Sequence, residues 1–242
     1  MKDTAWLGRT KLLIGEERLN NLIGSHVMVV GMGGVGSFAA EFICRAGVGE
    51  MTIIDGDTVD PTNRNRQLPA LATNHGEYKA AIMAERLSAI NPELKLNVVK
   101  EFVRPEMVEQ LFDRKPDYII EAIDSFTPKL TFIKAALRHK IPFVSSMGAG
   151  AKLDPTQLKV TDIWKTRNCP FAQQVRKVLR KEGIRKNFKV VFSPEEPIKE
   201  SLMLTDGTNF KKSAYGTMSY LPASFGAVLS SVAIRKLMDK KT

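Results

Sequence analysis

The stretch HVMVVGMGGVGSFAAEFICR, residues 26–45, decides the fold of this 242-residue chain. Its first five residues form a mostly apolar run, which is typical of a strand buried in a sheet. The glycines of GMGGVG permit a tight turn, and the run that follows, to Arg45, has the pattern of a helix. A strand, a glycine turn and a helix in this order indicate a parallel α/β unit. The turn is either a phosphate-binding loop or a place where glycines only allow close packing.

The same alternation of short apolar runs and longer helical patterns continues to about residue 150. Predicted strands are Met51–Ile54, Leu94–Val99, Tyr118–Ala122 and Ile141–Val144, and predicted helices are Glu77–Ile90, Pro105–Phe112 and Pro128–His139. Strands that are apolar on both faces and separated by helices favour the α/β class. We expect a Rossmann-like, mostly parallel sheet with helices on both faces.

A C-terminal strand and helix extension follows. It is predicted to hold strands at Leu158–Ile163 and Phe188–Phe192, helices at Phe171–Lys181 and Pro222–Met238, and a long loop over residues 193–218 with the turn-forming segments SPEEP and TDGTN. The extension has no apolar core of its own. The sequence therefore predicts one domain over residues 1–242, with a nucleotide-binding core at 1–150 and a dependent extension at 151–242.

Charge divides the chain at the same point. Residues 1–150 hold 18 basic and 18 acidic side chains, whereas residues 151–242 hold 18 basic and 8 acidic ones, so the net charge of +10 lies in the extension. A neutral core beside a basic extension indicates that the extension meets a polyanion.

The glycine turn is followed by a carboxylate at the spacing of a nucleotide site. Gly31, Gly33, Gly34 and Gly36 leave backbone amides open to phosphate, and Asp55, which ends the second predicted strand, can accept hydrogen bonds from ribose hydroxyls. These features alone would favour NAD. The segment DGDTVDPTNRNRQ and Lys79 add cations, which suit a triphosphate better, although Arg64, Arg66 and Lys79 also fit a solvated loop and a helix surface.

Four motifs together, GMGGVG, DGDTVDPTNRNRQ, GEYK and AIDS, resemble the nucleotide site of the adenylating enzymes related to ubiquitin-activating enzyme. The resemblance covers about residues 9–165 and implies a Rossmann-like homodimer that uses ATP and magnesium to form an acyl adenylate. It implies nucleotide and phosphate contacts by Asp55, Asp57, Asn63, Arg66, Gln67 and Lys79. It also implies a magnesium-associated acid, Asp124, and an arginine, Arg9, that reaches the partner's ATP site.

Within this superfamily, the segments AIDSFTPK, GAG and DPTQLKVTD resemble the tRNA threonylcarbamoyladenosine dehydratases. That resemblance implies ATP-dependent cyclisation of N6-threonylcarbamoyladenosine at position 37 of tRNA, with loss of water. One alternative is an adenylyltransferase that activates the C-terminus of a small sulfur-carrier protein, although the chain lacks the C-x-x-C pairs that hold zinc in many of those enzymes. A second alternative is an NAD-binding or regulatory Rossmann protein.

The basic residues of the extension concentrate in one segment. Between Lys165 and Lys189 nine cations face one acid, Glu182, and the spacing of those on the predicted helix indicates a helical stripe. We expect the anticodon-loop region of tRNA to contact the following residues: Arg176, Lys177, Arg180, Lys181, Arg185 and Lys186. A solvated helix face without a partner is the alternative.

The remaining expectations are smaller. Cys44 is predicted to pack in the core, and Cys169 invites comparison with the catalytic cysteine of ubiquitin activators, although ring closure needs no protein nucleophile. Two cysteines without a signal peptide favour a cytoplasmic protein. The late apolar run near 225–234 falls short of a membrane span, so weak membrane association through the C-terminal helix is a minor alternative. The sequence leaves open whether carbonyl oxygens near Gly148–Gly150 hold a monovalent cation.

Overall fold

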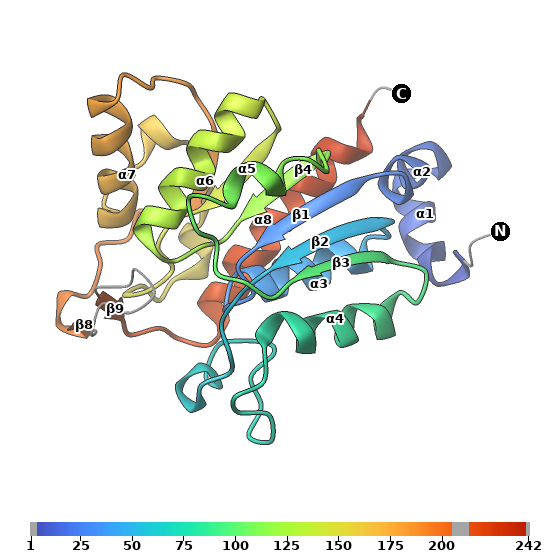
Figure 1. Cartoon of the computed structure of the whole chain (residues 1–242), viewed down its shortest axis with the longest axis horizontal. Helices are drawn as coiled ribbons and strands as arrows, with labels where there is room; N and C mark the ends of the chain where they lie inside the picture. The colour runs from blue at the N-terminus through green and yellow to red at the C-terminus, as the bar shows by residue number, and fades with distance from the viewer. Residues whose placement is uncertain (1–3, 205–212, 241–242) are drawn as a thin grey trace.

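A computed structural model describes residues 4–204 and 213–240, and its core is one seven-stranded sheet (Figure 1). The strands are β1 (His26–Val30), β2 (Glu50–Ile54), β3 (Lys95–Val99), β4 (Tyr118–Glu121), β5 (Phe143–Ser146), β6 (Lys159–Asp162) and β7 (Lys189–Phe192). Their order across the sheet is β3-β2-β1-β4-β5-β7-β6, and every pair is parallel except β6 with β7. The predicted α/β class and the mostly parallel sheet are confirmed.

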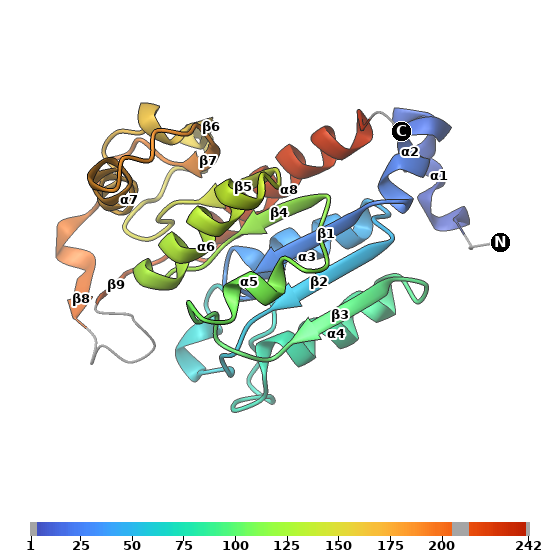
Figure 2. The same cartoon turned by 45° about the horizontal axis from the view of Figure 1, so that its top comes forward.

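Helices cover both faces of the sheet. They are α1 (Gly8–Ile14), α2 (Glu16–Ile23), α3 (Gly36–Arg45), α4 (Lys79–Ile90), α5 (Val108–Leu111), α6 (Phe126–His139), α7 (Pro170–Lys181) and α8 (Tyr220–Met238). One buried apolar cluster joins the sheet to α3, α4 and α8, and a second joins the opposite face to α5, α6 and α7 (Figure 2). Strands buried on both faces explain why their sequences are apolar throughout rather than alternating.

The central strands carry most of this pattern. All five residues of β1 are buried, and β1 pairs in register with β2 from His26 opposite Glu50 to Val30 opposite Ile54. Short 3-10 turns connect several elements: η1 (Ala5–Leu7), η2 (Pro61–Asn63), η3 (Pro155–Gln157), η4 (Ile163–Lys165) and η5 (Lys199–Ser201). Helices α1 and α2 lie at the end of the sheet where β1 begins (Figure 1), and the sequence patterns did not predict them.

Two helices begin later in the structure than the sequence patterns predict. Helix α4 begins at Lys79 rather than Glu77, because Tyr78 is held in an extended bridge to Thr58 and the Lys79 amide donates to the Asp57 carbonyl at 3.1 Å. Helix α5 spans only Val108–Leu111, since the residues that precede it form turns. Local hydrogen bonds and turns therefore make both helices begin later than the helical periodicity of the sequence predicts.

The extension adds β6 and β7 to the same sheet, with β7 paired to β5. The predicted loop over residues 193–218 is wrong in part, because β8 (Leu202–Leu204) and β9 (Ser213–Tyr215) pair as an antiparallel hairpin. The TDGTN segment lies outside the described residues.

Helix α8 closes the domain against α3. A methyl group on Gly226 would lie 2.6 Å from the Val35 carbonyl oxygen, so the two helices approach closely. The helix has 19 residues and is long and apolar enough to cross a membrane, so the expectation that its apolar run falls short of a span is corrected. Half of its apolar window is buried inside the protein, as expected for a core helix.

Candidate active site

The candidate site lies where the carboxyl ends of β1, β2 and β4 meet. The chain runs from β1 outward through β2 to β3, then returns to the other side of β1 to form β4. Such a switch point leaves a crevice outside the strand ends, which is where open α/β sheets bind ligands. The three strands lead into the glycine turn, Asp55 and the loop of Asp124, respectively.

The glycine turn is tight enough to require glycine at two of its positions. Gly31 has φ +91, and its amide donates to the Ile54 carbonyl oxygen at 2.8 Å. A methyl group on Gly36 would lie 1.7 Å from the Gly31 carbonyl oxygen. The turn therefore folds back on itself and aims the start of α3 at the crevice, where backbone amides and the helix dipole favour phosphate.

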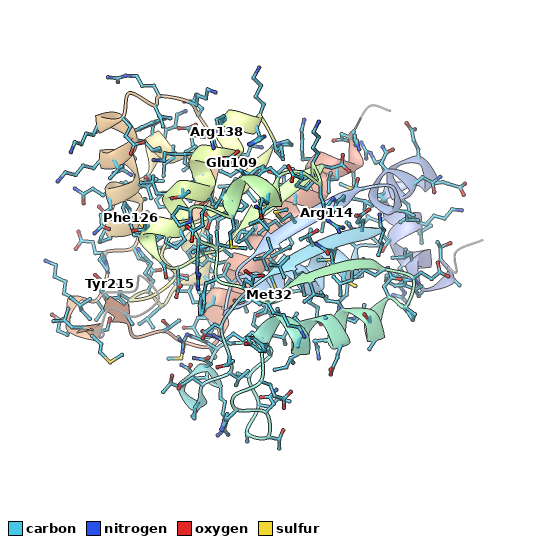
Figure 3. The ribbon with its side chains drawn as sticks, in the orientation of Figure 1. Met32, Glu109, Arg114, Phe126, Arg138 and Tyr215 are labelled. Atoms are coloured by element: carbon cyan, nitrogen blue, oxygen red, sulfur yellow. The ribbon has the colours of Figure 1, made fainter. Side chains whose placement is uncertain are left out.

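Asp55 joins the glycine turn to the loop after β2. One carboxylate oxygen accepts from the Met32 amide at 2.6 Å and the other from the Asp57 amide at 2.7 Å. Burial raises the pKa of Asp55, and the two amides act in the opposite direction. Each oxygen keeps a second lone pair, so ribose hydroxyls can still donate to this carboxylate. Figure 3 labels Met32 near the carboxyl ends of the central strands.

Lys79 is a buried cation at the start of α4. Only 4% of its side chain is exposed, and its ammonium pairs with Asp57, whose side chain is 48% exposed. The buried ammonium therefore pairs with a carboxylate that reaches the surface. A lysine held in this way supplies a compact charge to phosphate oxygens.

Arg66 and Asp124 are close enough for their charges to act on each other. The Arg66 guanidinium donates to the Thr62 carbonyl at 2.9 Å and to the Asn65 side chain at 2.8 Å. Burial lowers the pKa of Arg66, while the charge of Asp124 raises it. Asn63 is buried and caps the turn by accepting from the Asp60 amide at 3.2 Å, so it shapes the loop that carries Arg66.

Gln67 presents a buried hydrogen-bond acceptor beside the glycine turn. Its side-chain oxygen Oε1 is buried and has no hydrogen-bond partner among the described residues. The Gln67 side chain also lies beside the glycine turn, because its Nε2 is 3.8 Å from the position that a Cβ on Gly33 would take. A buried acceptor without a donor costs free energy, and a nucleotide hydroxyl or amine would satisfy it.

A buried ion pair below Asp124 was not predicted from the sequence. Lys129 and Glu121 have fully buried side chains, and the Lys129 ammonium also donates to the Ser146 carbonyl at 2.8 Å. Burial lowers the pKa of Lys129, and the charge of Glu121 raises it. The other Glu121 oxygen accepts from the Ile123 amide at 2.8 Å, next to Asp124. The sequence feature that could have indicated this ion pair is Glu121, a charged residue at the end of the otherwise apolar strand β4.

The basic residues of α7 do not form one uniform stripe. Arg176 donates to the Thr166 hydroxyl and Arg180 lies over the Trp164 ring at 5.4 Å, whereas Lys177 and Lys181 line a groove toward α6. In the loop after α7, Lys186 donates to the Leu137 carbonyl at 3.2 Å and Arg185 is exposed. The cations predicted to meet RNA therefore lie on two sides of α7.

Other predicted groups lie outside the crevice. Arg9 is exposed on α1, at the opposite end of the sheet (Figure 1), so it does not join the site of its own chain. Cys44 is buried in the core as predicted, where burial raises its pKa to about 12. Cys169 is buried in the second apolar cluster. In the part of the chain that the structure describes, no group of three or more His, Cys, Asp or Glu side chains could hold a metal ion.

Comparison with known proteins agrees with this geometry. The ThiF family model matches residues 8–242. The chain is 44% identical to the tRNA threonylcarbamoyladenosine dehydratase of Bacillus subtilis (strain 168), over 93% of this chain and 88% of the relative. It superposes on the crystal structure of the Escherichia coli tRNA N6-threonylcarbamoyladenosine dehydratase, TcdA, in complex with ATP with a TM-score of 0.89 and 41% identity, covering 98% of this chain and 97% of that chain.

A relative from another reaction class is more distant. The sulfur carrier protein ThiS adenylyltransferase of Escherichia coli (strain K12) is 26% identical over 54% of this chain and 53% of the relative. The similarity to the dehydratases covers nearly the whole chain, including the basic extension, and the similarity to this adenylyltransferase covers about half of it.

Proposed function

Because the chain belongs to the ThiF family, and within it to the tRNA threonylcarbamoyladenosine dehydratases, we propose that it cyclises N6-threonylcarbamoyladenosine at position 37 of tRNA in an ATP-dependent reaction. It is an adenylating enzyme. A carboxylate oxygen of the threonyl group attacks the α-phosphorus of ATP and pyrophosphate leaves. An atom of the ureido group then attacks the activated carbonyl carbon, AMP departs with the carboxylate oxygen, and the nucleoside has lost one water.

One observation carries this proposal: beside the glycine turn, the charges of Arg66 and Asp124 act on each other and the charge of Lys79 acts on Asp55. The attack brings a carboxylate toward a triphosphate, so negative charge accumulates between the reacting atoms. Arg66 and Lys79 are placed to offset that charge as it grows, which lowers the barrier of the step. An NAD site would need only backbone donors for its pyrophosphate, so these cations disfavour the Rossmann alternative.

Different residues of the crevice contact different parts of ATP in this proposal. The start of α3 receives phosphate oxygens, Asp55 accepts from the ribose, and Gln67 offers its unsatisfied oxygen to a nucleotide donor. Asp57 keeps Lys79 directed at the crevice, and Asn63 shapes the turn that presents Arg66.

Magnesium is a proposal supported by the donor set. Mg²⁺ keeps several waters and binds through one or two carboxylates together with substrate phosphates, rather than in a cage of protein ligands. Asp124, exposed at the end of β4, fits that pattern. The metal would screen the phosphate charge when it is bound.

The homodimer and the role of Arg9 are also proposals. Arg9 is exposed on α1, far from the crevice of its own chain, so an ATP contact by Arg9 requires a second copy. The exposed Leu12 and Leu13 of the same helix offer an apolar surface for that copy. An Arg9→Ala variant mixed with an Arg66→Ala variant should regain activity in mixed dimers, which hold one intact site.

Three further expectations stay proposals. The first is the monovalent-cation site near Gly148–Gly150. A cation already lies close to that loop in sequence, since the Lys152 ammonium donates to the carbonyl oxygens of Ser193 and Glu195 at 2.9 and 2.5 Å. The second is a cytoplasmic location. The third is weak membrane association through α8, and the burial of half of that apolar window weighs against it.

Substrate-dependent release of pyrophosphate and AMP tests the assignment. We expect both products with ATP and tRNA that carries threonylcarbamoyladenosine, and no pyrophosphate with the C-terminus of a sulfur-carrier protein. Arg66→Ala and Asp124→Ala should abolish AMP release, with Arg235→Ala, at the far end of α8, as a surface control. Pyrophosphate release that depends on the carrier protein instead would favour the sulfur-carrier alternative, and tight NAD binding without AMP would favour the regulatory one.

A further inference from the structure

A groove runs between α6 and α7. Near the starts of the helices Phe126 and Phe171 meet edge to face with ring centroids 6.2 Å apart, and near their ends Lys134 pairs with Glu182 at 3.0 Å. The helices therefore lie side by side in the same direction. Between these contacts the groove has a volume of about 290 Å³, and its lining is Phe126, Gln174, Lys177, Val178 and Lys181.

The groove has an apolar base and a positive rim. Phe126 and Val178 are half-buried, and Lys177 and Lys181, one turn apart on α7, are exposed. Among residues 4–204 and 213–240, no carboxylate pairs with either lysine. The nearest acid in the sequence, Glu182, is already paired with Lys134, so the rim keeps its positive charge.

We propose that this groove binds one unpaired base of the RNA loop, next to the reacting nucleoside, together with its flanking phosphates. The proposal rests on the function proposed above. Proteins hold single-stranded RNA by stacking bases on aromatic side chains and by setting cations along the backbone, and they read base edges with side-chain amides. Phe126 supplies the stacking ring, Gln174 the amide, and Lys177 with Lys181 the cations.

The position of Phe126 connects the groove to the chemistry. Phe126 begins α6 two residues after Asp124, and Figure 3 labels it between α6 and α7. A base stacked on Phe126 would leave the adjacent nucleotide near the carboxyl end of β4, where the charges of Asp124 and Arg66 act on each other. The groove volume of about 290 Å³ lies just below the ~300 to 1,000 Å³ of small-molecule sites, which suits one base rather than a duplex.

The first test compares ring variants by their tRNA dissociation constants and by KM for tRNA and for ATP. Phe126→Leu removes the ring and keeps an apolar side chain, so the dissociation constant of tRNA should rise about fivefold or more, with KM for ATP unchanged. Phe126→Tyr keeps the ring and should bind as the wild type does. Phe171→Leu removes the edge-to-face pair from outside the groove lining and should leave tRNA affinity unchanged.

The second test uses exposed lysines, whose replacement does not threaten folding. Lys177→Glu with Lys181→Glu should weaken tRNA binding and lower the slope of log affinity against log salt by about 0.7 for each phosphate that the protein no longer neutralises. Lys236→Glu, exposed near the end of α8, is the matched control and should change neither quantity.

The outcomes separate this proposal from the function on which it rests. Wild-type protein that neither binds nor converts the modified tRNA overturns the proposed function. Wild-type protein that converts it, while Phe126→Leu and the double lysine variant bind tRNA normally, overturns the groove alone. An equal loss in Phe171→Leu would assign Phe126 to helix packing and would also overturn the groove.

Discussion

Replacing Lys129 with methionine tests the buried ion pair that supports the loop of Asp124. The change keeps most of the side-chain stem and removes the ammonium, which leaves the Glu121 carboxylate in a fully buried position. Two partners of Glu121 would remain, the Ile123 amide at 2.8 Å and the Ser145 hydroxyl at 2.5 Å. Neither neutralises its charge, so the variant carries an uncompensated anion in the core.

Breaking a buried pair from one side costs about 3–5 kcal/mol of unfolding free energy. For a domain of this size each kcal/mol lowers the melting temperature by about 2–4 °C, so Lys129→Met should melt about 6–20 °C below the wild type. Adding Glu121→Gln removes the stranded charge while the glutamine oxygen can still accept from the Ile123 amide. The double variant should therefore recover most of the loss.

Thermal and urea unfolding measure the effect, and Lys134→Met on the same helix is the control. Lys134 and Glu182 are about one-third exposed, so breaking that pair should cost less than about 1 kcal/mol. A Lys129→Met variant no less stable than Lys134→Met would refute the reasoning. So would a double variant that is less stable than Lys129→Met.

Three more perturbations probe the crevice. Lys79→Ala should lower turnover without changing tRNA affinity, because its partner is ATP. Steady-state kinetics and a tRNA binding assay measure the two quantities, and weaker tRNA binding by the variant would contradict this prediction. Gly36→Ala places a methyl group 1.7 Å from the Gly31 carbonyl oxygen, so urea unfolding should show a loss of about 1–3 kcal/mol or more together with loss of ATP binding. Burial raises the pKa of Asp55, so ATP affinity should fall as the pH falls through that raised pKa and Asp55 gains a proton. Folding stability has the opposite dependence: the contribution of Asp55 is greatest at low pH and is lost as the pH rises through the raised pKa. Calorimetric titration across the mildly acidic range checks this, and an Asp55→Asn variant with the same pH step would contradict it.

The central elements could be predicted from sequence because their signals are local. The run His26–Val30 matches β1 residue for residue, since a strand buried on both faces must be apolar throughout. The glycine turn was readable because only glycine tolerates the φ of Gly31 and the close approach at Gly36. Asp55, Arg66 and Lys79 were recognised by spacing and by family resemblance, and the fold brings them to one edge of the sheet.

The features that were missed depend on contacts that only the folded chain makes. Lys129 is eight residues from Glu121, but the sequence does not show that their side chains form a buried ion pair when α6 packs beside β4. The hairpin of β8 and β9 was predicted as loop, because three-residue strands carry too little periodicity to be seen. The stripe expected on α7 is divided because Thr166 and Trp164, before the helix in sequence, take Arg176 and Arg180 to one side.

The most direct test of the central claim is mass spectrometry of nucleosides from tRNA incubated with the protein, with and without ATP. The account predicts that threonylcarbamoyladenosine loses the mass of one water only when ATP is present, and that Arg66→Ala stops the loss. Threonylcarbamoyladenosine that keeps its mass in the presence of ATP and folded protein would contradict it.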